Sequence, residues 1–304
     1  MNGPRASLAA IVLGSAAGGG FPQWNCGCRL CGLARARDPR VRAASQASVA
    51  ITGDDEGWLL VGASPDLRQQ LSQTPPLWPR TAGRDSPIRG VILIGGDIDA
   101  IAGLLVLRER QAFTIYAPGR LLDILAANPV FGVLDPAVVR RVEVRPMEPV
   151  ACGCGLTLTL LPMPGKVPLY LESRNDVGPE AEPTYAALLR SGGRGMIVAP
   201  ACADITGEVL EQLRQADVVL FDGTLFTDDE MIVAGLGKKT GRRMGHVSIS
   251  GPDGTLARLA DIPARRILLH INNSNPILLR DSPERRAVEA AGFEVAYDGM
   301  EIRL

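Results

Sequence analysis

Short apolar runs, separated by polar and glycine-rich stretches, are the main feature of the hydrophobicity pattern. Leu8–Leu13 begins the series, and we expect it to form the first core strand; as the apolar part of a signal peptide it would be at the short limit. Similar runs follow at 47–51, 57–63, 90–96, 113–117, 156–162, 195–200, 217–223, 266–272 and 293–299. Apolar runs of this length, bounded by turn residues, predict buried β-strands.

Amphipathic helical segments lie between many of these strands. The segments 64–73 and 282–292 each open with Ser-Pro and an acidic residue, which is typical of a helix start, and 206–216 places its apolar residues on one helical face. The early strands follow one another closely, whereas the later strands alternate with helices. This order predicts an α/β fold, with mixed sheets flanked by helices, as a single domain over residues 1–304.

Composition narrows the range of functions. The chain has 304 residues, of which 46% are hydrophobic and 21% charged, and this balance is typical of a globular protein. Its 32 Lys and Arg residues against 33 Asp and Glu residues give a net charge of −1, so there is no positive field for nucleic acid or a membrane surface. No apolar run approaches the roughly 20 residues of a membrane span. We therefore expect a cytoplasmic protein that binds neither nucleic acid nor membranes.

Three cysteines stand close together in the stretch GGGFPQWNCGCRLC. Cys26 and Cys28 are too near in sequence for an ordinary disulfide bond to each other. With Cys31 they form a C-x-C-x-x-C spacing, which favours thiolates that converge on one metal ion. The other cysteines are interpreted as buried or loop thiols: Cys152, Cys154 and Cys202.

Polar residues that follow apolar strands form a second group of candidates. Asp97 and Asp99 follow one such strand, Asp222 ends another, and His270 ends a third. A strand fixes such side chains while its end stays open to solvent. Each alone is better explained by a helix cap or a turn, but three such places together favour a common site. His246, the only other histidine, is the remaining candidate for a nitrogen ligand or a catalytic base.

Several other catalytic signatures are not found in the sequence. A Ser-His-Asp triad has no G-x-S-x-G turn to carry its serine. There is no P-loop and no G-x-G-x-x-G between a strand and a helix, so nucleotide chemistry is not supported.

Longer motifs, taken together, resemble the pyrroloquinoline quinone biosynthesis protein B family nearly from end to end. They are VLGSAAGGGFPQWNCGCRLC, ASPDLRQQL, FDGTLFTDDEM, GKKTGRRMGH, HINNSNPIL, DSPERR and VAYDGMEI. The patterns W-N-C-x-C-x-x-C and H-I-N-N-[ST]-N-P are specific. The resemblance implies membership of the metallo-β-lactamase superfamily, and therefore an αββα sandwich with its metal site at the strand ends.

The same resemblance implies a structural zinc ion in a cysteine-rich loop at residues 18–34. The three thiolates of C-x-C-x-x-C would supply three ligands, and a structural zinc site closes with four. The fourth ligand is left open between His270 and Asn273 of the HINN motif. We favour His270 for the catalytic pocket, because the superfamily's last metal-binding histidine ends a strand in this way.

The superfamily motif H-x-H-x-D-H aligns with Gly95, Asp97, Asp99 and Ala100, so its histidines are missing here. The resemblance then leaves an oxygen-rich metal-ligand set: Asp97, Asp99, Asp222 and His270, with His246 either completing it or acting as an acid or base. Such a set suits Fe²⁺ and O₂ better than a hydrolytic zinc pair. The catalytic candidates are Asp97, Asp99 and His246.

The activity that the resemblance implies is iron-dependent hydroxylation, by O₂, of the tyrosine ring of a cross-linked Glu–Tyr precursor in pyrroloquinoline quinone biosynthesis. A carrier of the quinone or its precursor is the alternative, favoured by Ala100, and a metal-dependent hydrolase comes third. Lys166 and Arg174 are candidates for binding the precursor's carboxylates, with solvated surface charge as the alternative. The expected partner is the small precursor, and a homodimer is left open.

Overall fold

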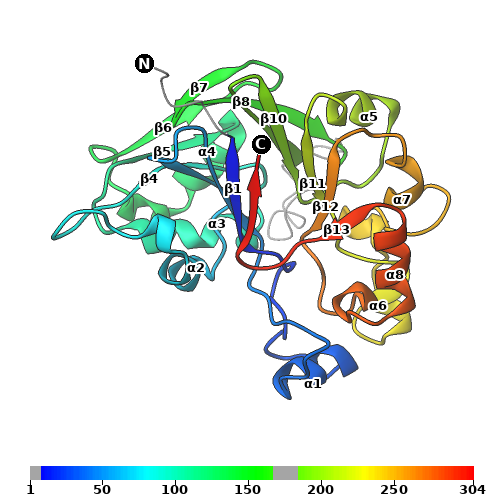
Figure 1. The fold of residues 1–304 in the computed structure, drawn as a ribbon. Coiled ribbons are helices and arrows are strands. Elements are labelled where there is room, and N and C mark those ends of the chain that lie inside the picture. The colour runs from blue at the N-terminus through cyan, green and yellow to red at the C-terminus, as the bar shows by residue number, and fades with distance from the viewer. Residues whose placement is uncertain (1–7, 167–183) are drawn as a thin grey trace.

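A computed structural model describes residues 8–166 and 184–304, and in this part of the chain the strands form two sheets that face each other (Figure 1). The first sheet contains, in spatial order, β14 (Met300–Arg303), β1 (Ala9–Gly14), β2 (Ser48–Thr52), β3 (Trp58–Val61), β4 (Ile88–Ile92), β5 (Phe113–Ala117) and β6 (Val139–Glu143). The second contains β13 (Phe293–Val295), β12 (Arg265–Leu269), β11 (Val218–Asp222), β10 (Arg194–Ala199), β9 (Thr184–Ser191), β8 (Leu156–Met163) and β7 (Val150–Gly153).

Most helices lie on the outer sides of the two sheets (Figure 1). The helices of the described residues are α1 (Arg29–Arg35), α2 (Leu67–Gln73), α3 (Ile98–Ile101), α4 (Gly119–Ala127), α5 (Gly207–Leu213), α6 (Glu230–Val233), α7 (Thr255–Arg258) and α8 (Pro283–Ala290). Short 3₁₀ turns also occur: η1 (Pro75–Leu77), η2 (Ala102–Leu107), η3 (Pro129–Val133), η5 (Arg242–Met244) and η6 (Pro276–Leu278). Helix α1 extends away from the two sheets, at the bottom of Figure 1.

The main hydrophobic core lies between the sheets. Val12 and Leu59 of the first sheet share it with Leu158 and Leu220 of the second, and all four side chains are fully buried. Burial of one such side chain contributes about 1.5–3 kcal/mol relative to exposure. Alternate residues of the strands therefore point inward, and the others face the helices.

Two further clusters join the helices to the outer faces. Leu67 of α2 and Leu125 of α4 are buried against the first sheet, and Leu213 of α5 and Val288 of α8 against the second. The result is the layer order helices, sheet, sheet, helices. The predicted αββα sandwich is confirmed.

Most of the predicted strands are present, but two kinds of detail differ. Helix α2 begins at Leu67, after an Asp66 N-cap that makes no side-chain capping bond, and Ser64 instead donates its hydroxyl to Gln70 Oε1 at 3.0 Å. Strands β6, β7, β9 and β14 were not among the predicted runs. In β9, TYAALLRS, the pairing with β8 and β10 on both sides outweighs the helix-forming tendency of Ala and Leu.

Parallel pairing brings the candidate residues to the same edge of each sheet. Strands β3 to β6 run parallel to one another, and so do β10 to β13. The carboxyl ends of such strands are the usual place for a binding site in an α/β protein. Asp97 follows β4, Asp222 ends β11 and His270 follows β12.

The two sheets are also joined by backbone hydrogen bonds at this edge. Ile271, just after β12, donates its N–H to Ser15 O, and Ala17 donates to Ile271 O, both at 2.9 Å. The chain that enters the cysteine loop is therefore tied to the end of β12. Among the described residues, no helix combines the length and the apolar character that a membrane crossing requires.

Candidate metal centres

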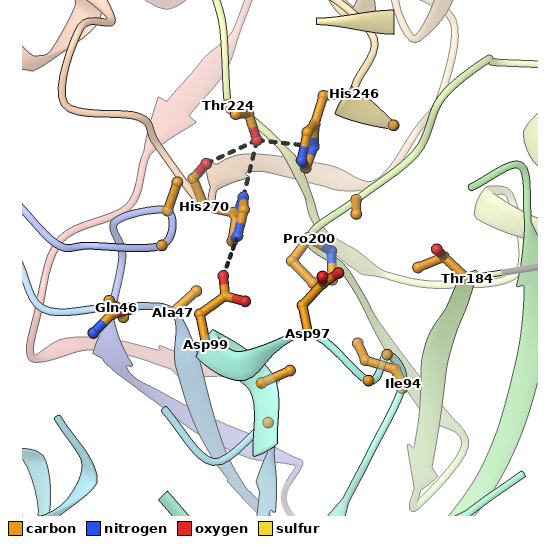
Figure 2. A pocket seen from close by; sticks show the side chains of 18 of the residues that line it. Gln46, Ala47, Ile94, Asp97, Asp99, Thr184, Pro200, Thr224, His246 and His270 are labelled. Carbon is orange, nitrogen blue, oxygen red and sulfur yellow. Dashed lines mark hydrogen bonds and ion pairs between the residues drawn. The ribbon is translucent and has the colours of Figure 1, made fainter. Parts of the chain in front are cut away.

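A cavity of about 660 Å³ lies at the carboxyl ends of the parallel strands. Its apolar walls come from both sheets and include Val49, Ile94 and Leu269. Its lining also includes polar side chains, which Figure 2 shows: Asp97, Asp99, Thr224, His246 and His270, together with Gln46 and Thr184. The strand-end candidates Asp97, Asp99 and His270 thus line one cavity, whereas Asp222 is not part of its lining and contacts the lining residues Thr224 and His246.

Asp99 and His270 make the first close pair of the cavity. Asp99 lies in the first turn of α3, and its Oδ2 is 3.1 Å from His270 Nε2. Gly18 leaves the space for this carboxylate, because a Cβ there would lie 3.3 Å from Asp99 Oδ2. The backbone of His270 has φ +62°, a left-handed conformation that residues other than Gly rarely adopt. Strained backbone of this kind often occurs at functional sites.

Asp99 and His270 stabilise each other's charged forms. Burial opposes charge on Asp99, but the hydrogen bond and positive charge of His270 outweigh it and hold the pKa of Asp99 below its ordinary value. Burial likewise acts against the charged form of His270, yet Asp99, Asp222 and Asp97 together raise its pKa. The metal-free pair therefore favours carboxylate and imidazolium, with Nε2–H donating to Asp99.

Asp222 and His246 make the second pair. Asp222 is fully buried, and its Oδ2 accepts from His246 Nδ1 at 2.8 Å and from the N–H of Cys202 at 3.0 Å. Its Oδ1 accepts from the N–H of Thr224 at 3.0 Å and from the Thr224 hydroxyl at 2.7 Å. The ring of His246 stacks on that of His270, with centroids 5.3 Å apart. Each Asp222 oxygen thus accepts two hydrogen bonds, and an ion would reach this carboxylate only by replacing one.

These residues fit a mixed oxygen and nitrogen metal site. Ligand atoms of Asp222, His246 and His270 all lie within 4.8 Å of one another. Asp99 Oδ2 and His270 Nε2, 3.1 Å apart, have nearly the separation of about 3.0 Å expected for neighbouring ligands bound at about 2.1 Å to an octahedral ion. Asp99 and His270 are therefore the residues best placed to hold an ion.

The remaining candidates take different positions. Asp97 lines the cavity and is the N-cap residue of α3 without a side-chain capping bond. Like Asp99, it is outside the group of Asp222, His246 and His270. Lys166 also lines the cavity, and its stem lies over Gly245, where a Cβ would be 2.9 Å from Lys166 Cγ. Ala100 faces the cavity with no ligand atom. Arg174 lies outside the described residues.

The sequence interpretation missed several contributors to this cavity. Thr224 touches both histidine rings, and the N–H of Cys202 holds Asp222. Arg120, at the start of α4, lines the cavity as a further cation. Thr224 follows Asp222 by two residues in FDGT, so the rule that selected Asp222 at a strand end could also have selected Thr224.

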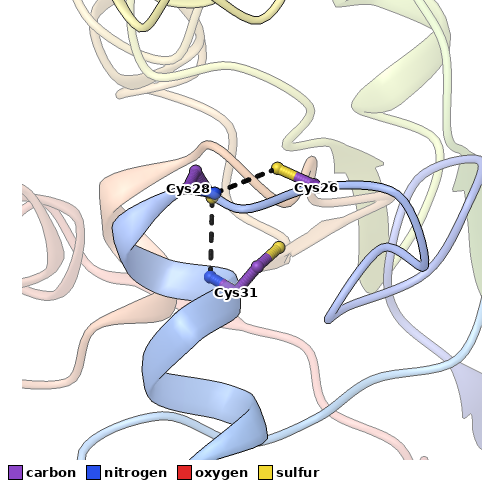
Figure 3. A group of neighbouring side chains, drawn as sticks. All are labelled: Cys26, Cys28 and Cys31. Atoms are coloured by element: carbon purple, nitrogen blue, oxygen red, sulfur yellow. Dashed lines mark hydrogen bonds between the residues drawn. The ribbon is translucent and has the colours of Figure 1, made fainter.

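The second centre is the cysteine cluster, which lies at the start of α1 (Figure 3). The sulfur atoms of Cys26, Cys28 and Cys31 lie within 4.8 Å of one another. Cys28 is the N-cap residue of α1 and its sulfur accepts from the N–H of Cys31, while the N–H of Cys28 points to Cys26 Sγ at 3.4 Å. Arg35 in the last turn of α1 donates to the carbonyl oxygen of Cys26 and so closes the loop.

Asn273 reaches the cysteine cluster from a distant part of the sequence. Its Nδ2 lies 3.1 Å from Cys26 Sγ and 3.4 Å from Cys31 Sγ, and the residue is buried. A half-turn of the amide exchanges Nδ2 for Oδ1 and would present an oxygen ligand. Sulfur ligands at 2.3 Å around a tetrahedral zinc ion are about 3.8 Å apart, so the cluster fits zinc with small movements. His270 lies in the cavity instead, paired with Asp99.

Burial disfavours the charged thiolate form of the cysteines when no cation is bound. It raises the pKa of Cys31 to about 11. At Cys26 burial acts in the same direction, but hydrogen bonds, chiefly from the N–H of Cys28, hold the pKa below its ordinary value. A bound cation would stabilise all three thiolates. The thiols Cys152, Cys154 and Cys202 are buried elsewhere in the structure.

Comparison with known proteins agrees with the fold and identifies the family. Residues 57–271 match the profile of the beta-lactamase superfamily domain, which defines the class of protein. Proteins described as "Coenzyme PQQ synthesis protein B" are 51% identical in Methylobacterium nodulans, over 98% of this chain and 100% of the relative, and 52% identical in Gluconacetobacter diazotrophicus, over 96% and 98%. The chain belongs to the coenzyme PQQ synthesis protein B family of this superfamily.

Solved structures give the same result. The chain superimposes on the Zn²⁺-bound PqqB of Methylobacterium extorquens with a TM-score of 0.94 and 48% identity, over 97% of this chain and 100% of the other. A diphosphatase of the PhnP family shares the fold, with a TM-score of 0.70 and 18% identity over 98% and 97% of the two chains. At that identity the likeness concerns the fold alone.

Proposed function

We propose that this chain acts in pyrroloquinoline quinone biosynthesis by hydroxylating the tyrosine ring of a cross-linked Glu–Tyr precursor with iron and O₂. The observation that carries the proposal is the Asp99–His270 pair in an apolar cavity. A ligand set of carboxylate and imidazole, with positions left for O₂ and substrate, is typical of non-haem iron oxygenases. The names of the relatives support the pathway.

Two metal ions belong to this proposal. Zinc would be held by Cys26, Cys28 and Cys31 with Asn273, supported by the spacing of their atoms and by the zinc in the related PqqB structure. Iron would be held by Asp99 and His270 and would supply the activation of O₂. The two centres are three residues apart along the chain, at His270 and Asn273.

The chain's own side chains have separate tasks in the cavity. The apolar walls, including Val49 and Ile94, can bind an aromatic ring and exclude water. Lys166 lies at the same cavity and can bind a precursor carboxylate. His246 donates from Nδ1 to Asp222, so its Nε2 is the atom that can accept the phenolic proton.

The proposed reaction replaces a ring carbon–hydrogen bond by a carbon–hydroxyl bond. One oxygen atom of O₂ enters the ring, and the other leaves as water with two protons and two electrons from an external two-electron reductant. The test is anaerobic loading with Fe²⁺, then addition of O₂, ascorbate and the cross-linked Glu–Tyr diamino acid. We expect O₂ uptake and a product that carries one atom from labelled O₂. Tight binding of the precursor without product would favour the carrier, and cleavage of simple phosphodiesters the hydrolase.

Ala100 provides a prediction about metal affinity. Ala100→His should bind Fe²⁺ about 10–100-fold more tightly, because it adds an imidazole at the position where the superfamily motif has one, and because Ala100 already faces the cavity. Ala102→His, placed beyond the cavity lining at the end of α3, is the control and should leave the affinity unchanged. Equal Fe²⁺ affinity of Ala100→His and the unmodified protein, measured anaerobically, would show that this side chain points away from the ion.

A further inference from the structure

The turn that follows β12 joins the cavity to the cysteine cluster, and its side chains point in two directions. Asn273 faces the sulfur atoms of the cluster. Its two neighbours in sequence, Asn272 and Ser274, instead contact the first two residues of α6. Neither the sequence pattern nor the two metal centres assign a role to these contacts with α6.

Glu230 is a buried acidic residue at the start of α6, with 9% of its surface exposed. Its Oε2 accepts the backbone N–H of Phe226 at 2.7 Å, and its Oε1 accepts the hydroxyl of Ser274. The proposed hydroxylation uses neither oxygen. Because a buried carboxyl group is costly unless its oxygens are hydrogen-bonded, the contact with Glu230 holds Ser274 in one place.

The donors and acceptors around Ser274 fix the direction of each hydrogen bond. Asn272 Nδ2 lies 3.1 Å from Met231 Sδ, and a thioether sulfur can only accept, so the amide nitrogen and not the amide oxygen faces this side. The same nitrogen therefore donates to Ser274 Oγ. The hydroxyl of Ser274 keeps its own hydrogen for Glu230 Oε1. One directed chain thus runs from Asn272 through Ser274 to Glu230.

The backbone on both sides of Asn273 is held as well. Asn272 donates its N–H to Thr224 O at 3.1 Å, and the fully buried Asn275 donates from Nδ2 to Gly223 O at 3.0 Å. The amide of Asn273, in contrast, faces sulfur atoms, which are weak hydrogen-bond partners. Its direction therefore depends on the two side chains that flank it.

We propose that Glu230 is a positioning residue for the cysteine cluster: it holds Ser274, and through it the turn, so that the Asn273 amide stays on the sulfur atoms. Residues behind a metal ligand orient that ligand, and their loss typically weakens metal binding by about 10–100-fold. The effect on zinc rests on the proposed function, in which Asn273 is the fourth ligand.

Four single variants test the proposal. Ser274→Ala removes the hydroxyl, and Ser274→Thr keeps it. Glu230→Gln must turn its one amide oxygen to the N–H of Phe226, so it offers Ser274 an NH₂ group, a donor in place of an acceptor. Asn273→Ala removes the amide of the proposed ligand itself.

The measurement is the affinity of the cysteine cluster for metal in the intact protein. Co²⁺ bound to thiolates gives a charge-transfer absorption, and none of the described residues that line the cavity is a cysteine, so this signal reports the cysteine cluster. Displacement of Co²⁺ by Zn²⁺ then gives the zinc affinity. Thr206→Ala is the control, because it removes the N-cap hydroxyl of α5 and should cost stability without weakening zinc binding.

We expect Ser274→Ala and Glu230→Gln to weaken zinc binding about 10–100-fold, and Ser274→Thr to stay close to the unmodified protein. Adding Ser274→Ala to Asn273→Ala should cost little further zinc affinity, because Ser274 acts through the Asn273 amide. Residues that act independently would instead give additive losses.

Unchanged zinc affinity in Ser274→Ala, or in Glu230→Gln where Ser274→Ala does not fold, would overturn the proposal and leave Asn273 as a ligand. Additive losses in the double variant would overturn it too, because they would show a general effect on the stability of the loop. Full zinc affinity in Asn273→Ala would contradict the proposed fourth ligand, and the positioning role with it.

Discussion

Replacing Cys26 by serine releases zinc from the cysteine cluster and destabilises the protein. We expect the unmodified protein to hold about one equivalent of zinc at this cluster, and the variant to lose that zinc and at least about 3 kcal/mol of unfolding free energy. This is a fraction of the roughly 10–16 kcal/mol with which zinc-finger peptides bind zinc at neutral pH. Little else stabilises the loop once the metal is lost, because its own hydrophobic cluster is small and includes the cysteines.

Cys152→Ser is the matched control for this prediction. Cys152 is also buried, more deeply than Cys26, but it lies in the main core between the sheets, where its thiol donates to Leu156 O. This variant should lose some stability through the buried hydroxyl and keep its zinc. Elemental analysis and thermal unfolding measure both effects. Full zinc content in Cys26→Ser would contradict the assignment of the cluster as a zinc site.

Replacing His270 is expected to have the largest effect on activity. His270→Asn is the suitable change, because Asn tolerates the left-handed backbone found there at φ +62°. It removes the imidazole that faces Asp99, so the cavity should bind Fe²⁺ at least about 100-fold more weakly and hydroxylation should fall in proportion. Zinc at the cysteine cluster and the melting temperature should change little.

The same substitution at the other ring separates the roles of the two histidines. His246 Nδ1 is bound to Asp222, so His246→Asn should leave Fe²⁺ affinity within about tenfold of the unmodified protein while turnover falls. Anaerobic Fe²⁺ titration and product formation are the two measurements. Equal losses of Fe²⁺ affinity in both variants would show that His246 is as much a ligand as His270.

The sequence predicted the three thiols of the cysteine cluster more firmly than the residue that faces them. The C-x-C-x-x-C spacing places three thiols on one short loop, and local geometry alone brings such residues together. Asn273, more than 240 residues further on, was left as one of two alternatives, and it is the tertiary fold that places it on the sulfurs. The HINN motif itself contributes to both centres, because His270 and Asn273 point in different directions from one turn.

Local sequence determined the elements of the fold and the positions of most candidate residues. Apolar runs predict the buried strands. Asp97, Asp222 and His270 were identified because they lie where such runs end. These are short-range properties of the chain, so they can be predicted without knowing which strands are neighbours.

Only the tertiary structure decided which of these residues meet. The parallel pairing of β10, β11 and β12, and the packing of the second sheet against the first, bring Asp99 to His270 across 171 residues of chain. The same pairing places the Thr224 hydroxyl between two imidazole rings. No local pattern encodes that contact. A hydrogen bond requires its two atoms to be placed to within a few tenths of an ångström, and here only packing brings the segments that carry them together.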